Sequence, residues 1–422
     1  MAFRFVHTAD IHLDSPLRSL ALRNRELAEL VGDATRRALV AIVDLCLEEQ
    51  VDALIIAGDL YDGDQTSMKT ARFLASQMER LHRAGIGVFK VRGNHDALSR
   101  ITQELILPPS VRVFGARADA VELRSGALDI VVHGLSFAKP QAPESLLPKF
   151  KRPTPDAVNI GILHTSLAGA PGHDIYAPCA VSDLHGWGFD YWALGHIHAR
   201  TKHAGDRAVI MPGMPQGRDI NEAGPKSVSL VTVRDDRTLL VEERVTSIAQ
   251  FERIPVDLSG ASSWREAIAQ IEGAVAAQRA RTTSEHLVGR LMLTGETPLS
   301  WRLRRDRDLL LTEVEQRAAG LGRTWIDKIE LATHAPSAEA AQRSADPVFE
   351  LGELMAAEEG DQLGMRQSVR ELVETVRDDL PPEARGFSGD SAVAFDAFLD
   401  RLLSEGRADV LARLTPREGG AD

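Results

Sequence analysis

Several short apolar runs in this sequence stop abruptly at clusters of polar residues, and this feature constrains the fold most. In the clearest case, the apolar run 86–91 leads into Gly93-Asn94-His95-Asp96. A buried strand that ends in a glycine turn places polar groups at its carboxyl end, where open α/β sheets hold their functional residues. Asn and His side chains can bind metal ions or phosphate, and Asp can orient a His. The stretch therefore predicts an α/β sheet with a functional edge.

The first part of the chain alternates between strand-like and helical patterns. Strands are predicted at 4–8, 52–57 and 86–91, and helices at 23–50 and 66–84. This order predicts a parallel sheet with right-handed crossovers. His7 alternates inward on the first strand, so we expect it in the core. Further short strands are predicted at 111–114, 120–123, 128–133, 159–163 and 191–194, with 209–211, 227–233 and 239–244 closing a second sheet.

The chain is too long, at 422 residues, for one hydrophobic core. We expect an α/β domain at 1–245, a small α+β domain at 246–335, and a linker with acidic helices at 336–422. Within the last two parts, strands are predicted at 254–258, 287–293 and 326–332, and helices at 264–281, 309–321, 351–380 and 393–413.

The net charge of -12 is concentrated near the C-terminus, because 345–422 holds 18 acidic and 8 basic residues. The acidic balance therefore does not exclude a nucleic-acid substrate for the first part of the chain.

Other features indicate a cytoplasmic protein. No apolar run reaches the ~18 residues of a membrane span. The N-terminus leads directly into a strand-like run and lacks the parts of a signal peptide. Two cysteines, Cys46 and Cys179, cannot form a disulfide framework, which favours a reducing compartment.

Polar clusters follow five of the predicted strands, and we expect all five to face one crevice. Seven of their side chains are candidate metal ligands: Asp10, His12, Asp59, Asn94, His164, His196 and His198. This number suits two adjacent divalent ions that share Asp59. Mixed nitrogen and oxygen ligands without thiolate suit Mn, Fe or Zn. Two ions ~3.5–4 Å apart can activate water and neutralise a phosphoryl group. His95, oriented by Asp96, is the predicted catalytic group that acts on the transition state or the leaving oxygen.

These motifs resemble those of the calcineurin-like metallophosphoesterase superfamily. The matching motifs are Asp10-x-His12, Gly58-Asp59-x-x-Asp62, Gly93-Asn94-His95-Asp96, His164 and Gly195-His196-x-His198. Within the superfamily, 8–13 and 58–62 resemble SbcD nuclease subunits. The YhaO-type branch, a family of DNA repair exonucleases, is similar also through 176–179 and 192–198. The resemblance covers the chain to about Val245, and 246–335 fits the family's capping domain in position and size.

The resemblance implies a fold and a set of roles. The fold would be a double-sheet sandwich flanked by helices, with a small α+β capping domain and a helical C-terminal tail. One ion, expected to be Mn²⁺, would be held by Asp10, His12, Asp59 and His198, and a second by Asp59, Asn94, His164 and His196. His95 would act on the phosphate and Asp96 would tune it. Residues that could face the substrate are Asp62, where nuclease relatives often have His, together with His173 and Tyr176.

The implied function is metal-dependent hydrolysis of DNA ends in repair, by a homodimer that works with an SMC-like (SbcC/YhaN-type) ATPase. One alternative is a small-molecule or cyclic-nucleotide phosphodiesterase, or a phosphatase, for which the capping domain and tail are unnecessary. Another is a non-catalytic DNA-binding scaffold of the ATPase, which would not need seven spaced ligands. A basic run, Arg302, Arg304, Arg305 and Arg307, is either a solvated face or a contact to the phosphate backbone.

Overall fold

The computed structural model describes residues 2–15, 25–62, 67–97, 106–167, 176–203, 205, 207–335, 351, 354, 355, 364–380, 382–389 and 391–414. Among these residues, no helix is long and apolar enough to cross a membrane. The chain divides into two compact units. The first unit combines Met1–Glu252 with Arg281–Val288, and the second combines Arg253–Ala280 with Gly289–Asp422.

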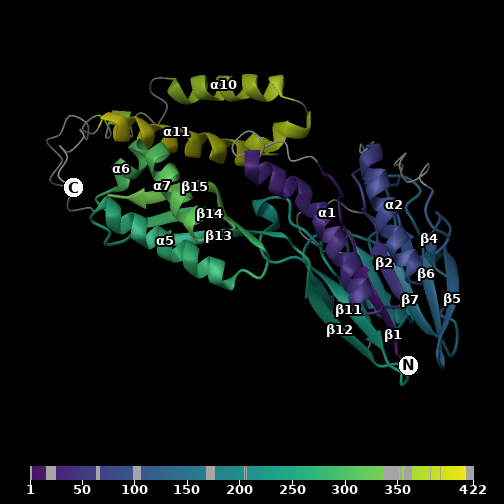
Figure 1. The fold of residues 1–422 in the computed structure, drawn as a ribbon. Coiled ribbons are helices and arrows are strands. Elements are labelled where there is room, and N and C mark those ends of the chain that lie inside the picture. The colour runs from purple at the N-terminus through teal and green to yellow at the C-terminus, as the bar shows by residue number, and fades with distance from the viewer. Residues whose placement is uncertain are drawn as a thin grey trace. The chain divides into compact units, whose positions relative to one another are not determined.

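One six-stranded sheet of the first unit holds the N-terminal strands (Figure 1). Its order is β12 (Leu239–Val245), β11 (Ser227–Val233), β1 (Phe3–Thr8), β2 (Ala53–Ala57), β3 (Gly87–Val91) and β4 (Val111–Val113). The pairs β1–β2 and β2–β3 are parallel, as predicted, and β4 adds a further parallel strand beside β3. Helices α1 (Arg25–Glu48) and α2 (Met68–Arg83) pack on one face of this sheet, where Ile42 and Leu74 join a core cluster with Ile56.

A second six-stranded sheet faces the first. Its order is β5 (Asp119–Ser125), β6 (Leu128–Gly134), β7 (Val158–His164), β8 (Tyr191–Gly195), β10 (Ala208–Met211) and β9 (Thr201–His203). Phe5 and Ile55 of the first sheet share a core cluster with Ile160 and Ile210 of the second. The outer face of the second sheet packs against α4 (Val181–Trp187) through Leu184. The predicted double-sheet sandwich flanked by helices is therefore confirmed, and His7 is fully buried within it.

The prediction that β11 and β12 close the second sheet is wrong. Strand β11 pairs antiparallel with β1, in the register Phe5↔Val231, and β12 pairs with β11. The alternation of β11 explains this placement. Leu230 packs in the core cluster beneath α1 and α2, whereas Val231 packs in the core between the sheets. Because both faces of β11 are apolar, the strand needs a neighbour that is covered on both sides, and the free edge of β1 supplies one.

The second unit is built around a three-stranded sheet. The strands β13 (Ala249–Asp257), β14 (His286–Glu296) and β15 (Thr324–His334) form this sheet, and β13 and β14 begin in the first unit. Its helices are α5 (Trp264–Arg281), α6 (Ser300–Arg305), α7 (Arg307–Gly320), α10 (Met365–Asp379) and α11 (Ala392–Leu414). Helices α10 and α11 lie side by side, and α11 also packs against α6 (Figure 1). The predicted linker at 336–350 and part of the predicted helix 351–380 lie outside the described residues.

Three 3₁₀ turns complete the described elements: η1 (Leu147–Lys149), η2 (Ile220–Glu222) and η5 (Pro382–Ser388).

Candidate metal centre

The predicted ligands come from the carboxyl ends of strands in both sheets. Asp10 and His12 follow β1, Asp59 follows β2, and Asn94 follows β3, while His164 ends β7 and His196 and His198 follow β8. Ligand atoms of Asp10, His12 and His198 lie within 4.8 Å of one another, and so do those of Asp59, His164 and His196. Asn94 Oδ1 lies 3.0 Å from His164 Nε2. The seven side chains therefore gather at one edge of the sandwich.

The backbone at the first ligands is held in an uncommon conformation. Asp10, His12 and Asp59 have φ angles of 51°, 44° and 50°. These angles lie in the left-handed region, which residues other than glycine rarely adopt. The two ligand loops support each other, because the Asp10 amide donates to Gly58 O at 3.1 Å and the His12 amide donates to Asp59 O at 3.1 Å. Strained backbone of this kind persists where the surroundings over-determine it, and it is concentrated at functional sites.

Two glycines of the motifs are explained by close packing at the same place. A Cβ atom on Gly58 would collide with the His164 ring, and its φ of +98° also disfavours a side chain. A Cβ atom on Gly93 would collide with the Asp59 carboxylate and with His164. The glycines therefore let the ligand loops of β2 and β3 approach the end of β7.

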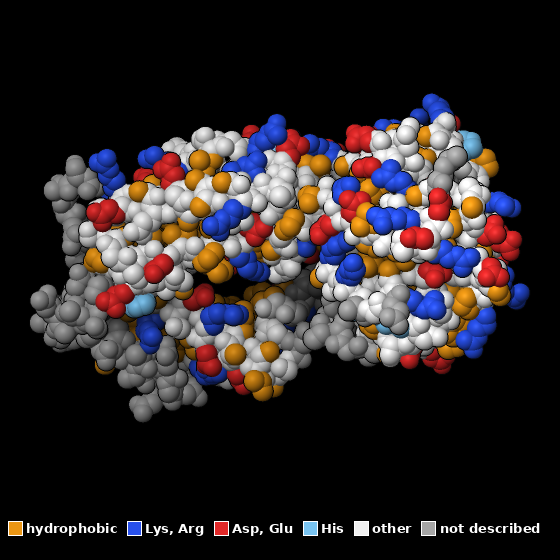
Figure 2. Space-filling model, turned by 90° about the horizontal axis from the view of Figure 1, so that it is seen from below, with side chains coloured by type: hydrophobic (Ala, Val, Ile, Leu, Met, Phe, Trp, Pro, Cys, Tyr) orange, Lys and Arg blue, Asp and Glu red, His pale blue; other side chains and the backbone are white. Residues whose placement is uncertain are grey.

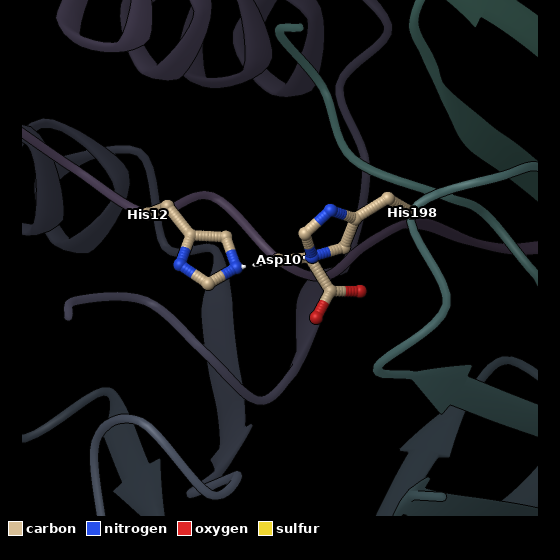
Figure 3. A group of neighbouring side chains, drawn as sticks. All are labelled: Asp10, His12 and His198. Carbon is tan, nitrogen blue, oxygen red and sulfur yellow. Dashed lines mark hydrogen bonds between the residues drawn. The ribbon is translucent and has the colours of Figure 1, made fainter. Parts of the chain in front are cut away.

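His12 and His198 both present a bare nitrogen to the same point beside Asp10. His12 Nδ1 lies 2.7 Å from Asp62 Oδ1, and His198 Nδ1 lies 2.9 Å from Glu222 Oε1. A carboxylate only accepts hydrogen bonds, so each Nδ1 carries the hydrogen and each Nε2 of a neutral ring keeps its lone pair. The two Nε2 atoms are 3.3 Å apart, with the rings turned towards each other beside Asp10 (Figure 3). Two lone pairs and an anion repel one another unless a cation lies between them, so these residues fit a metal ion.

A positive charge is also favoured in the second group of candidate ligands, which consists of Asp59, Asn94, His164 and His196. The His164 Nδ1–H donates to Ala57 O at 2.9 Å, so Nε2 faces two acceptors, Asn94 Oδ1 at 3.0 Å and Asp59 Oδ2 at 3.2 Å. Burial opposes a charge on His164, but the carboxylates of Asp59 and Asp10 raise its pKa to about 9. Burial also opposes a charge on Asp59, yet His164 and nearby histidines hold the pKa of that carboxyl well below its usual range. Without metal, a proton on His164 supplies the positive charge that this group requires.

His95 is the exposed member of the centre. Its side chain is 46% exposed, and its ring lies 5.0 Å from that of His12. The His95 amide donates to Asp59 Oδ1 at 3.0 Å, which ties its position to a ligand. Its Nδ1 is 3.4 Å from Asp62 Oδ1. Asp62 thus contacts both His12 and His95.

Asp96 faces the interior and not the ring of His95. Its fully buried carboxylate accepts from the Gly93 amide at 2.7 Å and lies 2.9 Å from Lys90 Nζ. It also accepts a long hydrogen bond, 3.4 Å, from the Leu60 amide. The carboxylate beside the His95 ring is that of Asp62, whose Oδ1 lies 3.4 Å from Nδ1. Asp96 instead joins the two ligand loops that follow β2 and β3.

Three residues near the centre were not found from the sequence. Lys90 lies in an apolar strand, and Arg218 and Glu222 lie in a polar stretch after β10 that carries no metal-binding motif. The spacing of Arg218 and Glu222 is the one sequence signal that could have suggested an ion pair.

The other predicted positions are divided. Tyr176 lies close to the centre, with its ring 5.2 Å from that of His196. His173 lies outside the described residues. The basic run of the second unit makes contacts within that unit: Arg302 lies over Trp264, Arg304 and Arg305 pair with Asp409 and Asp306, and Arg307 donates to Ile329 O.

Comparisons with known proteins agree with this geometry. The family model described as calcineurin-like phosphoesterase matches residues 3–200, and the one described as the middle domain of metallophosphoesterase YhaO matches residues 251–334. Metallophosphoesterase YhaO of Bacillus subtilis is 31% identical over 72% of this chain and 75% of its own length. The DNA double-strand break repair protein Mre11 of Sulfurisphaera tokodaii is 25% identical over 50% of this chain and 54% of its own. The protein of the same name from Methanopyrus kandleri is 24% identical over 62% and 61%.

Proposed function

Because the chain belongs to the calcineurin-like metallophosphoesterases, and within them to the YhaO family, we propose that it hydrolyses phosphodiester bonds at DNA ends as a DNA repair exonuclease of SbcD type. The family assignment makes it a metal-dependent phosphoester hydrolase. The proposal adds DNA as the substrate and Mn²⁺ as the metal.

The observation that carries the proposal is the facing pair of His12 and His198. Their Nε2 atoms converge beside Asp10, and a second group converges on Asp59. In the proposed centre, Asp10, His12, Asp59 and His198 hold one ion, and Asp59, Asn94, His164 and His196 hold the other. Bound divalent ions supply Lewis-acid chemistry, since they lower the pKa of water and offset charge on a phosphoryl group.

His95 is proposed as the group that protonates the leaving oxygen or stabilises charge on the phosphoryl oxygens. Its exposure lets a substrate reach the ring. The hydrogen bond from the His95 backbone amide to Asp59 Oδ1 holds the residue beside the candidate ligands. Asp62 would hold the Nδ1 side of His95, so that Nε2 faces the substrate. General acid catalysis of this kind contributes about 10²–10⁴-fold.

The choice of DNA rests on the relatives. Two of the relatives are named for the repair of DNA double-strand breaks. On the face that Figure 2 shows, Lys and Arg side chains are interspersed with Asp and Glu. We therefore place the substrate contacts at the centre itself, with Tyr176 beside His196, and keep His173 as a further candidate.

The remaining proposals concern organisation. We propose a nuclease domain at 1–245, a capping domain at 246–335 and a C-terminal region at 336–422. We also propose a homodimer and an SMC-like ATPase partner, and the acidic helices α10 and α11 are the candidate surface for that partner.

The test is hydrolysis in Mn²⁺ of a radiolabelled duplex with a single-stranded overhang, beside bis-p-nitrophenyl phosphate. We expect the chain to cut both substrates. His95→Ala should lower both rates about 10²–10⁴-fold while the bound metal is retained. His334→Ala is the matched control, because this exposed histidine lies in the second unit.

Other outcomes separate the alternatives. Cleavage of the small ester alone would replace the nuclease assignment by a small-molecule phosphodiesterase or phosphatase. DNA binding without cleavage of either substrate would favour a non-catalytic scaffold.

A further inference from the structure

We propose that Arg218 is a positioning residue that joins the two carboxylate–histidine pairs of the first metal group into one belt. The belt runs from His198 through Glu222, Arg218 and Ser15 to Asp62, which contacts His12 and His95. The inference rests on the proposed function, because it assigns a role to residues around the same centre.

The Glu222 end of the belt is fully engaged. Glu222 Oε1 accepts from His198 Nδ1 at 2.9 Å and from Arg218 Nη2 at 2.7 Å. Its other oxygen accepts from the Arg218 backbone amide at 2.7 Å and from Arg218 Nε at 3.2 Å. The planar guanidinium therefore binds both carboxylate oxygens in the fork geometry that only arginine offers. Glu222 cannot turn away from His198 without breaking this set.

The Ser15 end reaches the other pair. Arg218 Nη1 lies 3.5 Å from Ser15 Oγ, the longest link of the belt. The Ser15 hydroxyl in turn hydrogen-bonds the Asp62 carboxylate. Asp62 Oδ1 lies 2.7 Å from His12 Nδ1 and 3.4 Å from His95 Nδ1. One cation thus stands between the two carboxylates that orient the histidines.

This position has a physical consequence for metal binding. A carboxylate beside each Nδ1 holds the hydrogen of His12 and of His198 there, which leaves the lone pair of each Nε2 for the metal. The charge of Arg218 offsets the repulsion between the two carboxylates, and Asp62 and Glu222 both favour the charged form of Arg218. Through Glu222 on one side and through Ser15 and Asp62 on the other, Arg218 therefore fixes the orientation of two metal ligands, His198 and His12.

The role can be separated from simple support of the turn at η2. Support of the turn predicts a loss of thermal stability with unchanged metal affinity. Positioning predicts weaker binding of one ion by a folded protein. Arg218→Lys keeps the charge but removes the fork, so it tests geometry. Glu222→Gln keeps the shape but removes the charge that holds the His198 tautomer.

The experiment is a titration of the metal-free full chain with Mn²⁺, followed by calorimetry and by electron paramagnetic resonance. The natural chain should bind two ions and show the exchange-coupled signal of a Mn²⁺ pair. The affinity for one of the two Mn²⁺ ions should fall about 10–100-fold in each of Glu222→Gln, Arg218→Met and Arg218→Lys. The signal of a single Mn²⁺ ion should then persist at intermediate Mn²⁺ concentrations. Ser15→Ala should have a smaller effect in the same direction.

Two controls make the result decisive. Glu242→Gln removes the partner of Arg244 in another pair of the first unit, and it should leave both affinities unchanged. Circular dichroism checks that every variant is folded. Equal affinities in the natural chain, Glu222→Gln and both Arg218 variants would overturn the inference and leave the proposed function standing. Failure of the natural chain to bind Mn²⁺ would instead count against the proposed function.

Discussion

The candidate metal centre of the first unit and the second unit use their charged residues in opposite ways. In the second unit, arginines pair with neighbouring acids, as Arg290 does with Asp327 and Arg305 with Asp306. At the centre of the first unit, Asp10 and Asp59 are buried, and the Nε2 atoms of His12 and His198 face each other beside Asp10.

The comparison shows that the candidate metal site is marked by buried negative charge that the neighbouring side chains do not neutralise. The second unit contains the densest basic run of the sequence, yet each of its four arginines has a partner within the unit. The ligands of the first unit are spread over many strands, and they converge on points where only a cation would make the arrangement favourable.

The largest expected effect comes from the residue shared by both ions. Asp59→Asn should lower the rate of bis-p-nitrophenyl phosphate hydrolysis about 10⁴-fold. The change removes a negative charge that holds both ions, and with the ions the several kcal/mol by which they stabilise the transition state. Asp327→Asn breaks an ion pair of the second unit and should leave the rate unchanged. Steady-state rates of both variants test the comparison, and equal losses would break it.

The next effect is on folding. Lys90 and Asp96 are both buried, with Nζ and Oδ2 2.9 Å apart. Lys90→Met leaves the Asp96 carboxylate without its counter-charge, which should cost about 3 kcal/mol of unfolding free energy. Urea unfolding in EDTA measures this. The double variant Lys90→Met with Asp96→Asn should regain part of the loss, and no recovery would argue against the ion pair as the cause.

A pH effect of about 2 kcal/mol is expected from His7. This histidine is buried against Tyr191 and Leu194, and burial lowers its pKa from 6.5 to about 3. The unfolded chain therefore binds a proton at His7 that the folded chain does not bind. The contribution of neutral His7 to the free energy of unfolding is fully present above pH 6.5 and is lost as the pH falls towards 3. Between pH 6.5 and 5 the loss is about 2 kcal/mol.

The matched variant isolates this contribution. His7→Gln should flatten the fall in unfolding free energy between pH 7 and pH 5 by that amount, measured by urea unfolding in EDTA. Identical slopes in the two proteins would show that other groups cause the dependence.

The smallest effect is expected in the second unit. Arg302 lies 5.0 Å from the centroid of the Trp264 ring at a partly exposed position. Arg302→Gln should cost only about 0.5 kcal/mol of stability and leave cleavage of DNA and of the small ester unchanged. A selective rise in KM for DNA would instead show that the basic run contacts the phosphate backbone.

Much of the fold could be predicted from the sequence because apolar runs and helical periods are local signals. The strands that lead to Asp10, Asp59 and Asn94 were found in this way. The pairing of β11 with β1 was not, because an apolar strand fits any sheet that is covered on both faces. Helix α4 was missed because seven residues are too few to establish a helical period.

For the candidate site, the sequence predicted the candidate ligands but not the contacts that support them. The spacing of motifs after strands predicted the candidate ligands, and the structure brings them together. Adjacency in sequence suggested Asp96 as the partner of His95. The Asp96 carboxylate pairs with the buried Lys90, and Asp62, from the loop that follows β2, lies beside the His95 ring. The contacts of Glu222 with His198 and of Arg218 with Ser15 join residues distant in sequence, so no local pattern reveals them.

The most direct test of the central claim is anomalous diffraction from crystals of the full chain grown with Mn²⁺. We predict two anomalous peaks, one among Asp10, His12 and His198, and one among Asp59, Asn94, His164 and His196. Both should be coordinated by Asp59. A single peak elsewhere, or no peak at either group under metal concentrations that support hydrolysis, would contradict the account.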